Sequence, residues 1–107
     1  MQRYGQIIKV KPEAIAEYEQ IHTEVWPGVL ATIHACHIRN YSIYRYETWL
    51  FAYFEYIGSD FAADMRKMAA DPITQKWWSL TDPMQEPVPQ HREGDWWTVM
   101  KEVFHTE

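Results

Sequence analysis

A tyrosine, a histidine and a tryptophan recur at four-residue intervals in "YEQIHTEVWP", residues 18–27. On a helix, Tyr18 and His22 lie one turn apart and project from the same side. An imidazole exchanges protons near neutral pH, and a tyrosine hydroxyl beside it can orient the ring or bind a ligand. The same spacing also fits a partly buried histidine that is satisfied by a neighbouring carbonyl. Spacing alone therefore leaves acid–base catalysis and packing both open.

Two pairs of adjacent tryptophans are further candidates for ligand contact. Trp77 and Trp78 point about 100° apart on a helix, so one is expected in the core. The other can offer a flat apolar face to a ligand, such as the C–H face of a sugar, although packing alone also explains the pair. Trp96 and Trp97 fall where the last strand should begin, and there they favour core or dimer packing.

The segment "HACH" raises the question of a metal site at His34, Cys36 and His37. A catalytic zinc typically has three protein ligands, and the sequence offers no obvious partner set, so we expect no metal. Cys36 is expected to be a buried or semi-exposed thiol, because neither an acid nor a local motif supports a Cys/His hydrolase. Glycine-rich phosphate loops, nucleophile elbows and HExxH motifs are absent.

Composition narrows the class of protein. A net charge of −5 without a run of basic residues argues against nucleic acid as a partner. Six Trp, seven Tyr and four Phe exceed what a small core easily hides, which indicates a binding site or a subunit interface. The apolar runs fall far short of the ~20 residues that span a bilayer. With one cysteine and no signal-like start, the 107 residues are expected to form a single cytoplasmic domain, residues 1–107.

The first half of the chain alternates between strand and helix patterns. A strand is expected before Pro12, followed by a helix whose inner face carries Ile15, Tyr18, His22, Val25 and Val29. Pro27 should break this helix at about residues 23–27, and a second helical piece should run to Ala35. Strands are expected at 38–46 and 49–56. Strict alternation places Ile38, Asn40, Ser42 and Tyr44 on one face of the first, and Arg39, Tyr41 and Ile43 on the other.

The second half predicts two helices, a loop and a last strand. Ser59 is the expected N-cap of the first helix, with Phe61, Met65 and Met68 or Ala69 on its buried side. Asp71 should cap the second helix, which runs through Leu80. Residues 82–95 read as a loop, and a strand should follow from Trp96 to His105. The order β, α, β, β, α, β is typical of an α+β, ferredoxin-like plan: an antiparallel sheet with helices on one face.

Four segments together resemble a known family. "EYEQIHTEVWP", "RNYSIYRY", "QKWWSLTDPM" and "EVFH" are similar, in that order and at that spacing, to the L-rhamnose mutarotases, and the resemblance covers nearly the whole chain. It implies a ferredoxin-like fold that forms a dimeric α/β barrel. It also implies a homodimer that interconverts the α and β anomers of L-rhamnose without a metal or an organic cofactor.

The resemblance also implies roles for individual residues. His22 matches the family's proton donor, Tyr18 and Tyr41 match sugar-contacting tyrosines, and Trp77 with Trp78 match the pair that contacts the pyranose. Trp26 and Pro27 match the end of the first motif and are expected to be structural. The chain departs from the pattern at His37, where a glycine would be expected to end the helix; a non-glycine residue in a left-handed cap is strained. Related sequences act on other deoxy sugars such as L-fucose, so the reaction is better defined than the sugar.

Mutarotation needs one proton delivered to the ring oxygen and another taken from the anomeric hydroxyl. Our hypothesis is that His22 donates the first and that Tyr18, Tyr41 or a bound water completes the second transfer. Two alternatives remain open at this point. One is a cofactor-independent monooxygenase of the same fold, and the other is a non-catalytic sugar-binding or assembly module.

Overall fold

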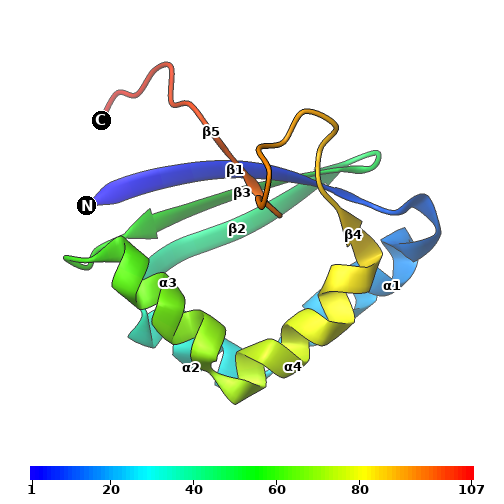
Figure 1. The fold of residues 1–107 in the computed structure, drawn as a ribbon, viewed down its shortest axis with the longest axis horizontal. Helices are drawn as coiled ribbons and strands as arrows, with labels where there is room; N and C mark the ends of the chain where they lie inside the picture. The colour runs from blue at the N-terminus through cyan, green and yellow to red at the C-terminus, as the bar shows by residue number, and fades with distance from the viewer.

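The computed structural model describes residues 1–107 as a curled antiparallel sheet with helices on one face (Figure 1). The strands are β1 Gln2–Val10, β2 Ile38–Tyr46, β3 Trp49–Tyr56, β4 Gln85–Glu86 and β5 Thr98–Met100. The α-helices are α1 Ile15–Ile21, α2 Pro27–Ala35, α3 Phe61–Ala70 and α4 Pro72–Thr81, and the 3₁₀ turns are η1 Pro12–Ala14, η2 His22–Glu24 and η3 Asp82–Met84. No helix has the length and apolar character that crossing a membrane requires.

The order of strands in the sheet is β2-β3-β1, with β4 and β5 both paired to the remaining edge of β1. β5 pairs with Gly5–Ile7 and β4 with Lys9–Val10, so the two short strands follow one another along that edge. All pairings are antiparallel. This arrangement confirms the ferredoxin-like plan predicted from the order of elements.

The break before Pro27 fixes the end of the first helix. Val25 and Trp26 are extended, with ψ angles of 137° and 136°, and Pro27 is the first residue of α2. A residue directly before proline avoids the helical region, which explains the extended conformation of Trp26. α1 ends at Ile21, so His22 lies at its C-terminal end rather than in its middle.

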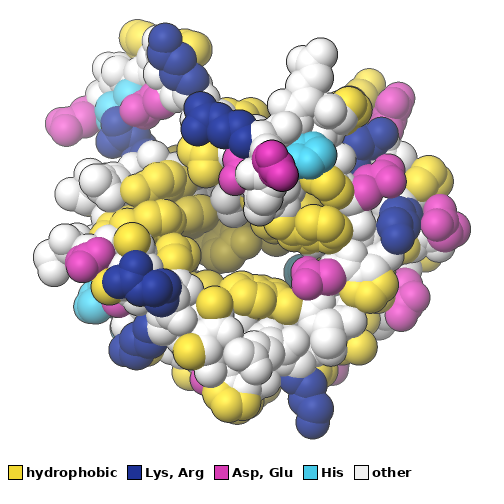
Figure 2. Space-filling view, viewed as in Figure 1, with side chains coloured by type: hydrophobic (Ala, Val, Ile, Leu, Met, Phe, Trp, Pro, Cys, Tyr) yellow, Lys and Arg dark blue, Asp and Glu magenta, His cyan; other side chains and the backbone are white.

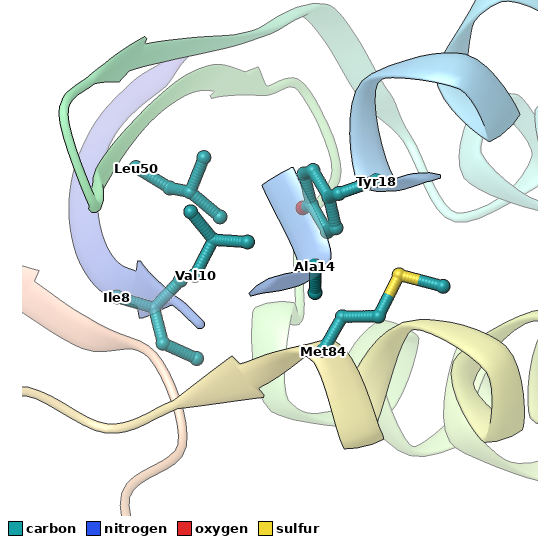
Figure 3. Packing of buried hydrophobic residues seen from close by; sticks show 6 residues of the cluster. All are labelled: Ile8, Val10, Ala14, Tyr18, Leu50 and Met84. Atoms are coloured by element: carbon teal, nitrogen blue, oxygen red, sulfur yellow. The ribbon is translucent and has the colours of Figure 1, made fainter. Parts of the chain in front are cut away.

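The core consists of two separate clusters between the sheet and the helices. The first joins Ile8 and Val10 of β1 and Leu50 of β3 to Ala14, Tyr18 and Met84 (Figure 3). The second comprises Cys36, Ile38, Phe54, Tyr56 and Met68. Because residues alternate along a strand, the even positions of β1 and β3 face the helices and supply all strand members of the two clusters except Ile38 of β2.

Strict alternation in β2 is wrong at its start. The pairing of β2 with β3 shifts between Arg39 and Ser42, because Asn40 has a φ of 52° and forms a β-bulge. Asparagine tolerates this left-handed conformation, and its side chain donates a 2.6 Å hydrogen bond to Glu55. The extra residue returns Ile38 to the same face as Tyr41 and Ile43, which all line one cavity.

One further expectation from the second half is wrong, and one alternative is decided. Asp60, not Ser59, is the N-cap of α3: its carboxylate accepts the N–H of Ala63, and a charged acceptor suits the positive end of a helix. Met68 is the buried residue of this helix, whereas Ala69 is exposed.

The last strand is much shorter than expected. Only Thr98–Met100 pairs with β1, and the chain beyond Met100 is exposed. The contact with β1 continues through a side-chain pair, Arg3 Nε to Glu102 Oε1 at 2.9 Å, instead of through backbone hydrogen bonds. The structure also forms η3 and β4 within residues 82–95, where a loop was predicted.

Candidate active site

A cavity of about 960 Å³ lies between the sheet and the helices, with residues of both core clusters among its lining. Figure 2 shows a hollow in the centre of this face that is lined mostly by hydrophobic side chains. All five residues predicted to act on the sugar line this cavity: Tyr18, His22, Tyr41, Trp77 and Trp78. They come from α1, its C-terminal end, β2 and α4, so the fold brings together three segments that are distant in sequence.

His22 is held by its own helix. Its Nδ1 lies 2.6 Å from the carbonyl oxygen of Tyr18. A carbonyl only accepts hydrogen bonds, so Nδ1 carries a proton and donates it. Nε2 is then the nitrogen that is free to exchange a proton with a ligand. The imidazole ring packs between the rings of Tyr18 and Trp77, at centroid distances of 4.3 Å and 5.4 Å.

The two adjacent tryptophans of α4 divide as predicted between core and surface. Trp77 is 6% exposed and contacts both His22 and Trp26 edge-on. Trp78 is 37% exposed and still lines the cavity, so a ligand can reach it. Gly28 lets α2 and α4 approach closely, because a Cβ at this position would lie 2.7 Å from Ile73 Cδ1. Trp26 is not among the residues that line the cavity, and it packs against Trp77.

A chain of hydrogen bonds, which the sequence analysis missed, fixes the Tyr18 hydroxyl. Gln85 Nε2 donates to this hydroxyl at 3.1 Å, and Trp96 Nε1 donates to Gln85 Oε1 at 2.8 Å. Gln85 is 5% exposed and lies in the short strand β4 that the sequence did not reveal. Only the alternation of Trp96 and Trp97 hinted that one of this pair faces inward.

Tyr18 and Tyr41, two of the tyrosines that line the cavity, are proton donors rather than bases at neutral pH. Burial raises the pKa of Tyr18, although the hydrogen bond from Gln85 lowers it in part. Burial also raises the pKa of Tyr41, and the nearby Tyr18 phenol raises it further. The Tyr41 side chain is partly exposed at the rim of the cavity. The two phenols therefore remain protonated and can donate hydrogen bonds to a bound hydroxyl.

Two carboxylates line the cavity, and they differ in their partners. Glu19 on α1 accepts a hydrogen bond from Arg45 Nε of β2, so its charge is neutralised and the pair links the helix to the sheet. Asp82, the first residue of η3, has no such partner among the basic side chains. Burial raises the pKa of its carboxyl group.

The "HACH" segment lies away from these groups. Cys36 is fully buried, and burial raises the pKa of its thiol. His37, where the family pattern has a glycine, adopts the left-handed conformation itself, with a φ of 66°. Its Nδ1 pairs with Asp64 Oδ2 at 2.9 Å. No group of three or more His, Cys, Asp or Glu side chains lies close enough to hold a metal ion.

The geometry suits acid–base chemistry on a small ligand with both polar and apolar faces. Aromatic rings supply walls on which an apolar face can stack. Protonated phenols supply hydrogen-bond donors, and one imidazole supplies a nitrogen that can give or take a proton. These are the requirements of a site that opens and closes a sugar hemiacetal.

Sequence comparison identifies relatives of the chain over its whole length. The family model described as L-rhamnose mutarotase matches residues 3–106. An L-rhamnose mutarotase of Oceanobacillus iheyensis is 33% identical, and one of Bacillus subtilis is 30% identical, each over the whole of both chains. An L-fucose mutarotase of Xanthomonas campestris pv. campestris is 31% identical over 97% of this chain and 87% of its own.

Solved structures support the fold independently. The crystal structure of an L-rhamnose mutarotase from Formosa agariphila matches the whole of both chains with a TM-score of 0.78 at 21% identity. Tetracenomycin F2 cyclase from Streptomyces glaucescens, a type-II polyketide cyclase, matches all of this chain and 97% of its own with a TM-score of 0.61 at 17% identity. On the family match and the relatives together, the chain belongs to the L-rhamnose mutarotases, a family of isomerases.

Proposed function

We propose that this chain interconverts the α and β anomers of L-rhamnose in the cavity between the sheet and the helices. The observation that carries the proposal is the state of His22. Its Nδ1–H is committed to the Tyr18 carbonyl, so Nε2 is the nitrogen available to a ligand in a cavity walled by aromatic rings. The family match specifies the sugar chemistry that such a nitrogen would serve.

In this proposal each predicted residue has a distinct task. His22 Nε2 delivers a proton to the ring oxygen, which opens the hemiacetal to the aldehyde. Tyr18 and Tyr41 donate hydrogen bonds to sugar hydroxyls, and Trp78 stacks on the C–H face of the pyranose. Trp77 supports the imidazole from behind and completes the apolar wall. Such positioning lowers the barrier by holding the ring in a reactive orientation.

We also propose that the chain acts as a homodimer, joined through the face of the sheet that the helices leave open. Tyr44, Tyr46 and Phe51 on this face are 66%, 68% and 37% exposed. An aromatic surface of this extent is typical of a subunit interface. A cytoplasmic location fits the single cysteine, which is buried and unpaired.

The test is saturation-transfer NMR between the α and β anomer signals of L-rhamnose, with L-fucose and D-glucose as parallel substrates. We expect the protein to accelerate exchange of L-rhamnose and to leave D-glucose at its spontaneous rate. If all three sugars exchange only at the spontaneous rate, the proposal is wrong.

L-fucose is the second candidate, because one relative of 31% identity is named an L-fucose mutarotase. Exchange that is faster for L-fucose than for L-rhamnose in the same experiment would favour this sugar. The proposed roles of the cavity residues would be the same for either substrate.

A further inference from the structure

Mutarotation requires a group that accepts the proton of the anomeric hydroxyl, and the cavity limits the choice. Its other titratable side chains, apart from Asp82, are Tyr4, Tyr18, Glu19, His22, Tyr41 and Arg45. Tyr18 and Tyr41 have raised pKa values and stay protonated, so neither is an effective base. Arg45 is permanently charged, and it neutralises Glu19.

We propose that Asp82 is the second catalytic residue, the base that takes the proton of the anomeric hydroxyl. The inference rests on the proposed mutarotase function and extends it by one residue. Asp82 is the cavity carboxylate whose charge no basic side chain neutralises.

The backbone places Asp82 beside the aromatic wall on which the sugar would stack. Its N–H donates to the carbonyl of Trp78, so the two residues are one helical turn apart and project from the same side. Trp78 and Asp82 both line the cavity, and both are exposed to solvent at its rim. A pyranose stacked on Trp78 would therefore have Asp82 at its edge.

The same segment is tied to the surroundings of His22. Gln85, three residues after Asp82, donates to the Tyr18 hydroxyl, and the Tyr18 ring packs on the imidazole of His22. Trp77, which precedes Asp82 by five residues, touches His22 from the other side. The end of α4 and the end of α1 thus meet over one part of the cavity, which brings an acid and a base to the same ligand.

Asp82 and His22 together account for both proton transfers of the reaction. The Asp82 carboxylate takes the proton from the anomeric oxygen while the bond from C1 to the ring oxygen breaks, and the ring oxygen takes a proton from His22 Nε2. The products are the open-chain aldehyde, a protonated Asp82 and a neutral imidazole. After rotation about the C1–C2 bond, the hydroxyl attacks the other face of the carbonyl. His22 regains its proton, and the carbonyl oxygen takes the proton back from Asp82.

The raised pKa of Asp82 supports this role. Partial desolvation raises the pKa of this carboxyl, which makes its carboxylate a stronger base than an ordinary aspartate. The rate should therefore fall at acid pH as Asp82 takes up a proton. This acid limb should lie above the usual aspartate range.

The experiment compares wild type with Asp82→Asn, and Asp95→Asn serves as the control, because Asp95 is an exposed loop carboxylate outside the cavity. We expect Asp82→Asn to lower kcat for L-rhamnose exchange by about 100-fold or more, in the range that general-base catalysis supplies. The Kd for L-rhamnose, followed by tryptophan fluorescence, should change by less than about threefold. The acid limb of the pH profile should disappear, and Asp95→Asn should behave as wild type.

Chemical rescue provides a second variant. Formate added to Asp82→Ala should restore part of the lost rate, because a small carboxylate can fill the space and act as the base. If Asp82→Asn keeps kcat within about fivefold of an active wild type and retains the acid limb, Asp82 is not the base. A wild type without accelerated exchange would instead overturn the proposed function itself, so the two failures are distinguishable.

Discussion

Two histidines follow neighbouring helices in this chain, and their surroundings differ. His22 follows α1 and gives Nδ1 to the Tyr18 carbonyl, so Nε2 is left for the cavity. His37 follows Cys36 at the end of α2 and gives Nδ1 to the carboxylate of Asp64. Asp64 also accepts a hydrogen bond from the buried Tyr56 hydroxyl.

Each histidine has a tyrosine and an aspartate in its part of the molecule. Only the set around His37 is closed, in the sense that its three side chains hydrogen-bond to one another. Tyr56, first, and then His37 lower the pKa of Asp64 by hydrogen bonding to it, so the three groups satisfy one another. In the cavity that His22 lines, the hydroxyl of Tyr18 is held by Gln85, and the aspartate, Asp82, has no basic partner. A closed network stabilises the fold, whereas an open one is available to a ligand.

The largest expected effect comes from exchanging each histidine for asparagine. His22→Asn should lower kcat for anomer exchange by about 10²- to 10⁴-fold, because it removes the proton donor while its amide can still bond the Tyr18 carbonyl. His37→Asn should retain kcat within about twofold, since asparagine tolerates a positive φ and can still reach Asp64. Saturation-transfer NMR measures both. Equal losses of kcat in the two variants would contradict the functional difference between the histidines.

The two tryptophans of α4, Trp77 and Trp78, test the surroundings of His22 further. Trp77→Ala should lower the free energy of unfolding by about 3–5 kcal/mol, because the buried indole leaves a void behind His22. Trp78→Ala should lower it by less, because this side chain is more exposed, and should mainly raise the Kd for the sugar. Urea unfolding and fluorescence titration separate the two effects. A larger loss of stability in Trp78→Ala would contradict the assignment of Trp77 to the core.

A smaller effect is expected from Asp64→Asn, which opens the closed network. The pKa of Asp64 is lowered from the usual 3.8, so its contribution to stability is present above about pH 4 and is lost as the pH falls through the lower, folded value. At neutral pH the variant should melt roughly 5 °C below wild type, and the difference should vanish toward pH 2. Thermal melts across this range test the prediction. A constant difference at all pH values would exclude the network as its source, and a loss of kcat would make this network part of the active site.

Much of the fold followed from the sequence because its elements carry strong local patterns. The order of strands and helices and the break at Pro27 were predicted from periodicity and proline chemistry, whereas the backbone conformation of His37 was not. The bulge at Asn40 was missed, because one residue in a left-handed conformation leaves no mark on hydrophobic spacing. β4 was missed as well, because two residues between prolines pair with β1 only in the folded sheet.

The site was predicted only in part, for a related reason. Tyr18, His22 and the tryptophan pair were visible because each lies in a compact motif. Gln85 and Trp96 were not recognised, because their importance comes from the hydrogen bonds that link them to Tyr18 of α1, more than sixty residues away in the chain. Asp82 was not recognised, because only the folded chain shows that it lines the same cavity. The spacing of Trp78 and Asp82, one helical turn, was the signal that would have found the aspartate.

The comparison of the two histidines can be tested directly by ¹⁵N NMR of histidine-labelled protein titrated with L-rhamnose. The ring nitrogens report protonation and hydrogen bonding at each imidazole. We expect the Nε2 resonance of His22 to shift in proportion to the bound fraction, with the His37 resonances unchanged. A sugar-dependent shift at His37, or an unperturbed His22 in the saturated complex, would contradict the account.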